Sequence, residues 1–447
     1  MTSVEVTKDT NKKKRKVVKS HNNDTDAIII KPSSDNKNYK KILLENGLKV
    51  CLISDPTPGS ETKEIGVSLS VGVGSFSDPK DRQGLAHLLE HVILMGNKKY
   101  PVENSLDDYL EATGGYSNAY TECEQTYFYM SVLPEHIDEA LDRFANIFIN
   151  PLLRPSTFRR EINAVDSEFK AAIQSDAERS QQIFSKYCSH VYHNFLWGNE
   201  RSLKVPDDDD DTINNNNGNK NYDDNSTEFL LKTFYEKYYS SDIMNLVIIA
   251  SESKIKNIEN QVHALFSMIE NKNLKNEVLI LASNNNTNLM QQLAYAKEKN
   301  PKVTIIESLR QQTNRLKLIF QLPSLQSKYS RKPSSYIASL LGHESEGSVL
   351  EELKRLGLAT NISCGCSHDG FSRSSIVFLF EVSVQLTEKG LFEYEHVIKL
   401  IFEYINMLKR DGAQQWYCEE NMHLSKLEFN FESEDDPCDF ALSVCER

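Results

Sequence analysis

With 447 residues, of which 39% are hydrophobic, the chain is long enough for roughly two to four packed domains. A net charge of −13 argues against the basic face that a nucleic-acid-binding protein needs, and no apolar run is long enough to cross a membrane. We therefore expect a soluble globular protein that binds neither nucleic acid nor membrane, and whose negative charge suits basic peptides as substrates.

The N-terminal segment, residues 1–40, is polar and rich in lysine, which predicts a disordered tail. It contains no apolar stretch like that of a secretory signal, and the eight cysteines show no disulfide spacing, so we expect a cytoplasmic location. The basic run Lys12 to Lys16 fits either a solvated tail or a nuclear-import signal. A mitochondrial transit peptide is disfavoured because arginines are few and acidic residues are present.

Residues 41–282 are predicted to form a first domain of strands and helices. Alternating apolar residues predict a strand within 65–75, which follows another strand at 48–55. The further predicted elements are a helix over 82–95, a short helix from Ser105 to Gly114, a strand over 117–132 and helices from about Pro134 and Ser156. The asparagine- and aspartate-rich stretch 206–226 is predicted to be a disordered insertion in this domain.

Residues 290–447 repeat this order loosely after a flexible tether near 283–289. The predicted strands lie at 302–307, 315–323 and 375–387, and the helices at 333–341, at 347–356 and from 388 onward. The sequence thus predicts an α+β fold of two homologous domains, each a mixed or antiparallel sheet packed against helices. The second domain carries no metal-binding pattern and is expected to be incomplete at its C-terminus.

The stretch GLAHLLEHVILMG, residues 84–96, predicts a helix with two distinct faces. Its apolar stripe consists of Leu85, Leu88, Leu89, Val92 and Ile93. His87, Glu90 and His91 fall on the opposite side, where the two histidines lie one turn apart and can reach one ion. This spacing suits zinc, although it leaves other divalent metals open, and the alternative is an exposed polar face of chance composition.

The pattern H-x-x-E-H inverts the H-E-x-x-H helix of metalloproteases. Glu90 would then be the general base that takes a proton from the water attacking a peptide carbonyl. A catalytic zinc also needs a third protein ligand, and the predicted helix 160–173 offers Glu161 and Glu168 on one face. Asp166 and Glu178 are equally eligible, and a solvated acidic rim is the alternative.

Together, these two stretches resemble the pitrilysin family of inverted zincins. The resemblance implies that Glu168, 77 residues after the second histidine, is the third zinc ligand and that Glu161 is the acid that orients a ligand. The stretch 114–132 resembles the edge strand with which that family binds a substrate backbone by strand addition. The implied binding pair is Asn118 and Ala119, whereas the alternative is an ordinary sheet strand.

Within that family, the chain resembles the insulysin–nardilysin branch, and its nardilysin side more closely. The stretches 28–55, 72–79 and 430–446 carry this resemblance, which extends over about residues 28–447 apart from the insertion. It implies zinc-dependent endopeptidase activity on peptides, one Zn²⁺ per chain, cleavage beside basic residues, and one half of a clam-shell. The long acidic stretch of nardilysin is missing, since residues 56–64 read PTPGSETKE.

A second substrate site is implied by SLLGHESEGS, residues 339–348, which resembles the family's anchor for a substrate N-terminus. Gly342 and Glu344 are the matching residues, whereas Cys364 stands where the family has a glycine. The alternative is a polar helix end. A further pair, His190 and His193, is read as surface or pocket residues rather than as metal ligands.

A different class of function also fits the sequence. The family's second half, which closes the chamber and contributes groups that hold the scissile carbonyl, has no counterpart in this sequence. The chain would need that C-terminal half or a partner chain to close the chamber. The alternative to an active peptidase is therefore an inactive fragment or a module that binds peptides or proteins without cleaving them.

Overall fold

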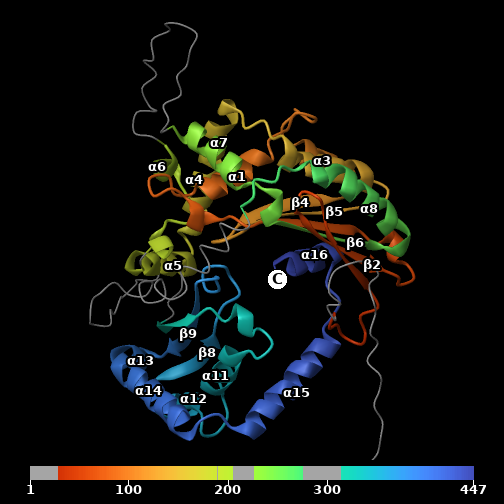
Figure 1. Cartoon of the computed structure of the whole chain (residues 1–447). Helices are drawn as coiled ribbons and strands as arrows, with labels where there is room; N and C mark the ends of the chain where they lie inside the picture. The colour runs from red at the N-terminus through yellow and green to blue at the C-terminus, as the bar shows by residue number, and fades with distance from the viewer. Residues whose placement is uncertain (1–28, 189, 205–225, 275–313, 447) are drawn as a thin grey trace, which may run out of the picture.

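The computed structural model describes residues 29–188, 190–204, 226–274 and 314–446, which form two α+β units joined by a long helix (Figure 1). The basic run at 12–16, nearly all of the predicted insertion, the tether at 283–289 and the predicted strand at 302–307 lie outside these residues. The first strand begins at Asn38, inside the segment predicted to be a tail. The predicted domain limits otherwise stay predictions.

The first unit is built on a mixed six-stranded sheet with the order β1-β2-β6-β3-β5-β4. Only the neighbours β2 and β6 run parallel, and every other pair is antiparallel. The strands are β1 (Asn38–Leu43), β2 (Lys49–Asp55), β3 (Ile65–Val71), β4 (Tyr116–Thr121), β5 (Thr126–Val132) and β6 (Met244–Ser251). The strand β4 lies at an open edge, which leaves one side of its backbone free to pair with another chain.

Helices cover one face of this sheet and enclose the main hydrophobic core (Figure 1). They include α1 (Leu85–Ile93), α2 (Ser105–Ala112), α3 (Ile137–Ile149), α4 (Pro155–Ala172), α7 (Thr227–Tyr238) and α8 (Glu252–Leu265). Two further helices, α5 (Asp176–Tyr187) and α6 (Glu200–Leu203), follow α4. The predicted apolar stripe of α1 is buried in this core, with each of its five side chains at most 1% exposed.

The single strand predicted over 117–132 is two strands, β4 and β5, which pair as an antiparallel hairpin. Residues 122–125 form the turn, in which the backbone N–H of Glu122 donates to the carbonyl of Gln125 (2.8 Å). The sequence of this turn, ECEQ, contains none of the glycine, proline or asparagine residues that usually mark a hairpin. That is why the break was not predicted.

The opposite face of the sheet is covered by the last helix, α16 (Pro437–Glu446), which lies across β3 and β6 (Figure 1). Its residues belong to the segment predicted as the second domain. A methyl group at Gly66 would lie 2.2 Å from the carbonyl oxygen of Pro437, so the close approach of α16 requires glycine in β3. Every residue of β3 is therefore buried, on both faces of the sheet.

The second unit has a three-stranded antiparallel sheet with the order β7-β9-β8. Its strands are β7 (Arg315–Pro323), β8 (Ala359–Gly365) and β9 (Val377–Leu386), and its helices are α11 (Pro333–Leu341), α12 (Val349–Arg355), α13 (Glu388–Phe392) and α14 (Tyr394–Asp411). The helix α15 (Gln415–Phe431) then runs from this unit towards α16 (Figure 1). This arrangement agrees with the predicted α+β plan.

The two units also meet at the β4–β5 turn. The Glu124 carboxylate accepts hydrogen bonds from the backbone N–H (2.7 Å) and the hydroxyl (2.5 Å) of Ser375. Beside this contact, the rings of Tyr192 and Phe371 pack with centroids 5.1 Å apart. The second unit therefore contacts the hairpin that carries the open edge strand. None of the helices in the described ranges is both long and apolar enough to span a bilayer.

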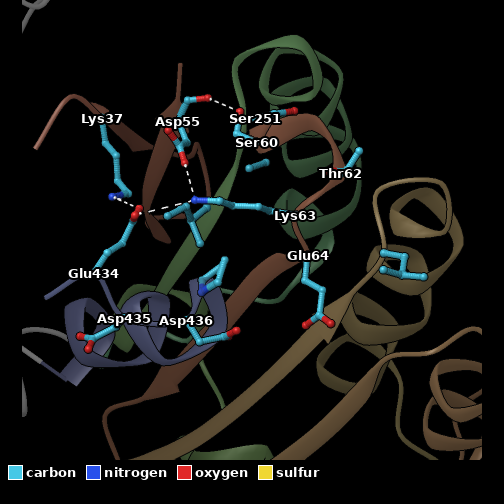
Figure 2. Close-up of a pocket in the computed structure, with 14 residues that line it drawn as sticks. Lys37, Asp55, Ser60, Thr62, Lys63, Glu64, Ser251, Glu434, Asp435 and Asp436 are labelled. Atoms are coloured by element: carbon cyan, nitrogen blue, oxygen red, sulfur yellow. Dashed lines mark hydrogen bonds and ion pairs between the residues drawn. The ribbon is translucent and has the colours of Figure 1, made fainter. Parts of the chain in front are cut away.

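A pocket of about 630 Å³ lies where the segment before α16 meets the first unit (Figure 2). Lys37 Nζ contacts Glu434 Oε1 at 2.8 Å, and Lys63 Nζ lies 3.8 Å from both Glu434 Oε2 and Asp55 Oδ2. These charged groups pair with one another, as expected for contacts that fasten a segment to a surface. None of the three predicted metal ligands lines this pocket.

Candidate metal centre

The helix α1 is fixed at its N-terminus by a buried carboxylate. Asp78 accepts hydrogen bonds from the backbone N–H groups of Gly84 (2.6 Å) and Ala86 (2.8 Å), where the helix dipole favours negative charge. Burial raises the pKa of Asp78 to about 7, although these N–H groups oppose the shift. The start of α1 at Leu85, and with it His87 two residues later, is thereby anchored to the loop before the helix.

Two glycines bring the loop after α5 against the start of α1. Gly84 has a φ of +95°, and a methyl group on it would lie 2.1 Å from the Cα atom of Gly198. This contact places the carbonyl oxygen of Trp197 2.7 Å from His87 Nδ1. A carbonyl only accepts, so Nδ1 carries the proton and the other ring nitrogen, Nε2, keeps its lone pair.

The second histidine is oriented by an acid on α4. His91 Nδ1 faces the Oε2 atom of Glu161 at 3.6 Å, and Glu161 is buried with 6% of its surface exposed. A carboxylate at this position favours a proton on Nδ1, which again leaves Nε2 free to bind a metal. Glu161 is therefore close enough to orient the His91 ring.

The three predicted metal ligands converge on one point. The Nε2 atoms of His87 and His91 lie 3.4 Å apart, and the Glu168 carboxylate lies 3.4 Å from the first and 3.6 Å from the second. Ligands at about 2.0–2.1 Å from a tetrahedral zinc would be about 3.3–3.4 Å apart, so the triangle fits that ion. Within the described ranges, this is the one group of three or more such side chains close enough to share a metal.

The charges in this site favour a cation between the three side chains. Burial lowers the pKa of His91, but Glu161 and Glu168 outweigh it and raise the pKa to about 10. Burial also lowers the pKa of His87, but Glu168 reverses the shift and raises it. Both histidines in turn hold the pKa of the Glu168 carboxyl well below its ordinary value. The two Nε2 lone pairs, 3.4 Å apart, would repel each other unless a cation or a proton lay between them.

Glu90 lies beside this triangle, buried between α1 and the edge strand. Its side chain is on the predicted polar face of the helix, yet only 6% of the residue is exposed. The Thr121 hydroxyl on β4 donates to Glu90 Oε2 at 2.6 Å. Burial raises the pKa of Glu90, and the nearby His87 partly opposes this shift. A carboxylate with a raised pKa next to a metal position can act as a general base near neutral pH.

The other acidic candidates have different partners. Asp166 Oδ1 accepts from the backbone N–H of Glu200 (3.1 Å), and its other oxygen pairs with Lys170 (2.5 Å). The Glu178 carboxylate accepts from the indole N–H of Trp197 at 3.3 Å, so it supports the residue whose carbonyl holds the first histidine. His193 is exposed, as expected for a surface residue.

The predicted substrate-binding pair lies on the open edge strand. In β4, Asn118 is opposite Tyr129 of β5 and Ala119 is opposite Phe128, so the far side of β4 faces away from the sheet. The side-chain oxygen of Asn118 accepts from the backbone N–H of Ala119 at 2.8 Å. A peptide that added to this edge would have to replace that local hydrogen bond.

The second predicted substrate site lies in the other unit. Gly342 caps the C-terminus of α11, and a methyl group on it would lie 3.9 Å from Cβ of Cys364 in β8, so the two segments adjoin. Glu344 is exposed and lies 3.7 Å from Lys354. The structure therefore does not bring these residues into the group formed by α1, α4 and β4.

Two contributors to the site were not predicted from the sequence. Trp197 acts through its main-chain carbonyl, which every residue type has, so its role cannot be predicted from the sequence. The following glycine, Gly198, was the visible signal, because a glycine permits a close backbone approach. Thr121 lies two residues after the predicted pair Asn118-Ala119, but nothing in the sequence connects it to Glu90.

Comparison with known proteins matches both units to sequence patterns of the same peptidase family. The sequence pattern of the insulinase family (peptidase family M16) matches residues 50–192, and that of the peptidase M16 inactive domain matches residues 230–424. Insulin-degrading enzyme of Drosophila melanogaster is 36% identical over 417 residues, which cover 92% of this chain and 38% of that protein. The nardilysin-like protein of Arabidopsis thaliana is 34% identical over 391 residues, covering 87% of this chain and 35% of that protein.

The crystal structure of pitrilysin superposes with a TM-score of 0.77 at 28% identity, and the match covers 94% of this chain and 41% of pitrilysin. The predicted insulysin–nardilysin branch is thus supported, although identities of 36% and 34% are too close to separate its two sides. The chain spans well under half the length of each of these relatives.

Proposed function

Because the chain belongs to the insulinase family, peptidase family M16, we propose that it is a zinc metalloendopeptidase with His87, His91 and Glu168 as the metal ligands. The observation that carries the proposal is the triangle of two Nε2 atoms and one carboxylate with sides of 3.4–3.6 Å. Zn²⁺ held there would polarise the scissile carbonyl and lower the pKa of a water molecule.

The protein's own groups then have separate tasks. Glu90 takes the proton of the attacking water and passes it to the leaving amine. Glu161 and the Trp197 carbonyl keep both imidazoles in the tautomer that binds metal through Nε2. The free edge of β4 binds the peptide backbone at Asn118 and Ala119, so that an extended substrate lies beside α1.

We further propose that substrates are basic peptides. The net charge of −13 attracts them over long distances, which supports this class without fixing the cleaved bond. Anchoring of a substrate N-terminus by Gly342 and Glu344, one Zn²⁺ per chain and a cytoplasmic location are part of the same proposal. The second candidate function is a peptide- or protein-binding module without turnover, in which the open edge of β4 holds an extended chain by strand addition.

Metal content measured by mass spectrometry, together with cleavage of a quenched Arg-Arg peptide, tests the proposal. We expect about one zinc per chain and hydrolysis that stops when a chelator removes the zinc and returns when zinc is restored. Zinc without hydrolysis of this or a second, non-basic peptide would favour the binding module. A chain that takes up no zinc would contradict the proposal.

Zinc binding should become tighter as the pH rises. At neutral pH the metal-free protein keeps a proton on His91, whose pKa Glu161 and Glu168 raise to about 10 against the effect of burial. Zinc binds only neutral imidazoles, and the pKa of His87 is raised as well, so the apparent affinity should rise at least tenfold per pH unit between about pH 6 and pH 8. Calorimetry in two buffers of different ionisation enthalpy would measure the release of at least one proton per zinc. An affinity that does not change with pH would contradict this prediction.

A further inference from the structure

The base proposed for the reaction is held by the strand proposed to bind the substrate. Thr121 is the last residue of β4, and its hydroxyl donates to Glu90 Oε2 at 2.6 Å. Asn118 and Ala119 lie three and two residues earlier, respectively, on the same strand. The contact therefore connects the open edge of the sheet to the polar face of α1 by one short, charge-assisted hydrogen bond.

This hydrogen bond restricts the side chain of Glu90, which is already confined by burial. Glu90 is 6% exposed, and a buried carboxylate that has lost its hydration is destabilised unless a hydrogen-bond donor replaces the water. Because Thr121 engages one carboxylate oxygen, Oε2, the other oxygen, Oε1, is left for the attacking water. A β-branched residue in a strand has few χ1 rotamers, so the donor itself is well placed.

The end of β4 is held from the other side by the second unit. The carboxylate of Glu122, the next residue, accepts from the backbone N–H of Gly370 at 3.0 Å. A methyl group on Gly370 would lie 2.6 Å from that carboxylate, so the fit is close. Glu124 on the same turn binds Ser375. The strand end that carries Thr121 is thus clamped between α1 and the second unit.

We propose that Thr121 is a positioning residue, whose hydroxyl fixes the Glu90 carboxylate for proton transfer and ties it to the strand that receives the peptide. This inference rests on the proposed peptidase function. In this role the threonine does not contact the reacting atoms. Removing its hydroxyl should therefore slow the chemical step and leave the binding of metal and peptide unchanged.

The test compares Thr121→Val, Thr121→Ser and Thr157→Val in the zinc-loaded full chain. Valine keeps the branched shape and removes the hydroxyl, whereas serine keeps the hydroxyl. Thr157 is the control, because its hydroxyl also donates to a glutamate, Glu103, at 3.0 Å. We expect kcat to fall about tenfold in Thr121→Val, with KM and zinc content unchanged, to recover in Thr121→Ser, and to stay at the parent value in Thr157→Val.

A Thr121→Val variant with the parent kcat, or a serine variant as slow as the valine variant, would overturn the inference. A second measurement reads the contact without turnover. The shifts in urea midpoint caused by Thr121→Val and Glu90→Leu, each of which removes the hydrogen bond, should be non-additive in the double variant, and additive shifts would also overturn it. A parent chain that binds no zinc or cleaves no peptide instead refutes the proposed function, which the non-additivity does not depend on.

Discussion

Glu90→Gln is expected to lower peptide hydrolysis by about 10²–10⁴-fold and to leave the zinc content of the protein unchanged. The amide has the same shape as the carboxylate and can still accept the hydrogen bond that Thr121 donates at 2.6 Å. It cannot accept a proton from water, however, so only the base is removed. The raised pKa of Glu90, caused by burial, makes the parent carboxylate a stronger base than an exposed one.

The measurement is kcat on the quenched peptide alongside zinc by mass spectrometry. Glu103→Gln is the control, because Glu103 also accepts a threonine hydroxyl, from Thr157. The control should keep the parent rate. A Glu90→Gln variant that hydrolyses the peptide at the parent rate would exclude Glu90 as the base, whereas one that loses its zinc would give the residue a role in metal binding instead.

The helix that carries the metal ligands could be predicted from the sequence because its two faces differ in composition. Leu85, Leu88 and Leu89 are fully buried, as the helical period requires. The same period cannot tell what covers the opposite face. It placed Glu90 on a polar side that would ordinarily be solvated, whereas packing of β4 and α4 against α1 buries the residue.

The contacts between distant segments were beyond the reach of sequence patterns. Trp197 contributes a main-chain carbonyl, and any residue type has one. The placement of α16 on the sheet had one visible sign, Gly66 inside a predicted strand, because a glycine there permits another backbone to come close. The glycine indicates that another segment of backbone packs closely against the strand, but it does not identify that segment. Residues 437–446 could therefore not be assigned to the first sheet in advance.

Helical spacing alone could not select the third metal ligand among the four acidic candidates. In the structure, the four side chains differ in the groups that they contact. Glu168 faces both histidines, whereas Asp166 is engaged with Lys170 and the start of α6. The choice of Glu168 in the sequence came from a family resemblance, and the contacts of Glu168 on α4 with both histidines of α1 support it.

Glu168→Gln should therefore weaken zinc binding by roughly a hundredfold or more, because the amide lacks the negative charge with which a carboxylate ligand binds Zn²⁺. Glu161→Gln should weaken it by about 10–100-fold, since Glu161 acts through His91. Asp166→Asn, on the same helix, should bind zinc like the parent. Competition with a chromogenic chelator measures all three affinities under one condition. Equal losses in Glu168→Gln and Asp166→Asn would mean that disturbance of α4, rather than loss of a ligand, releases the metal, and the triangle would then no longer identify the site.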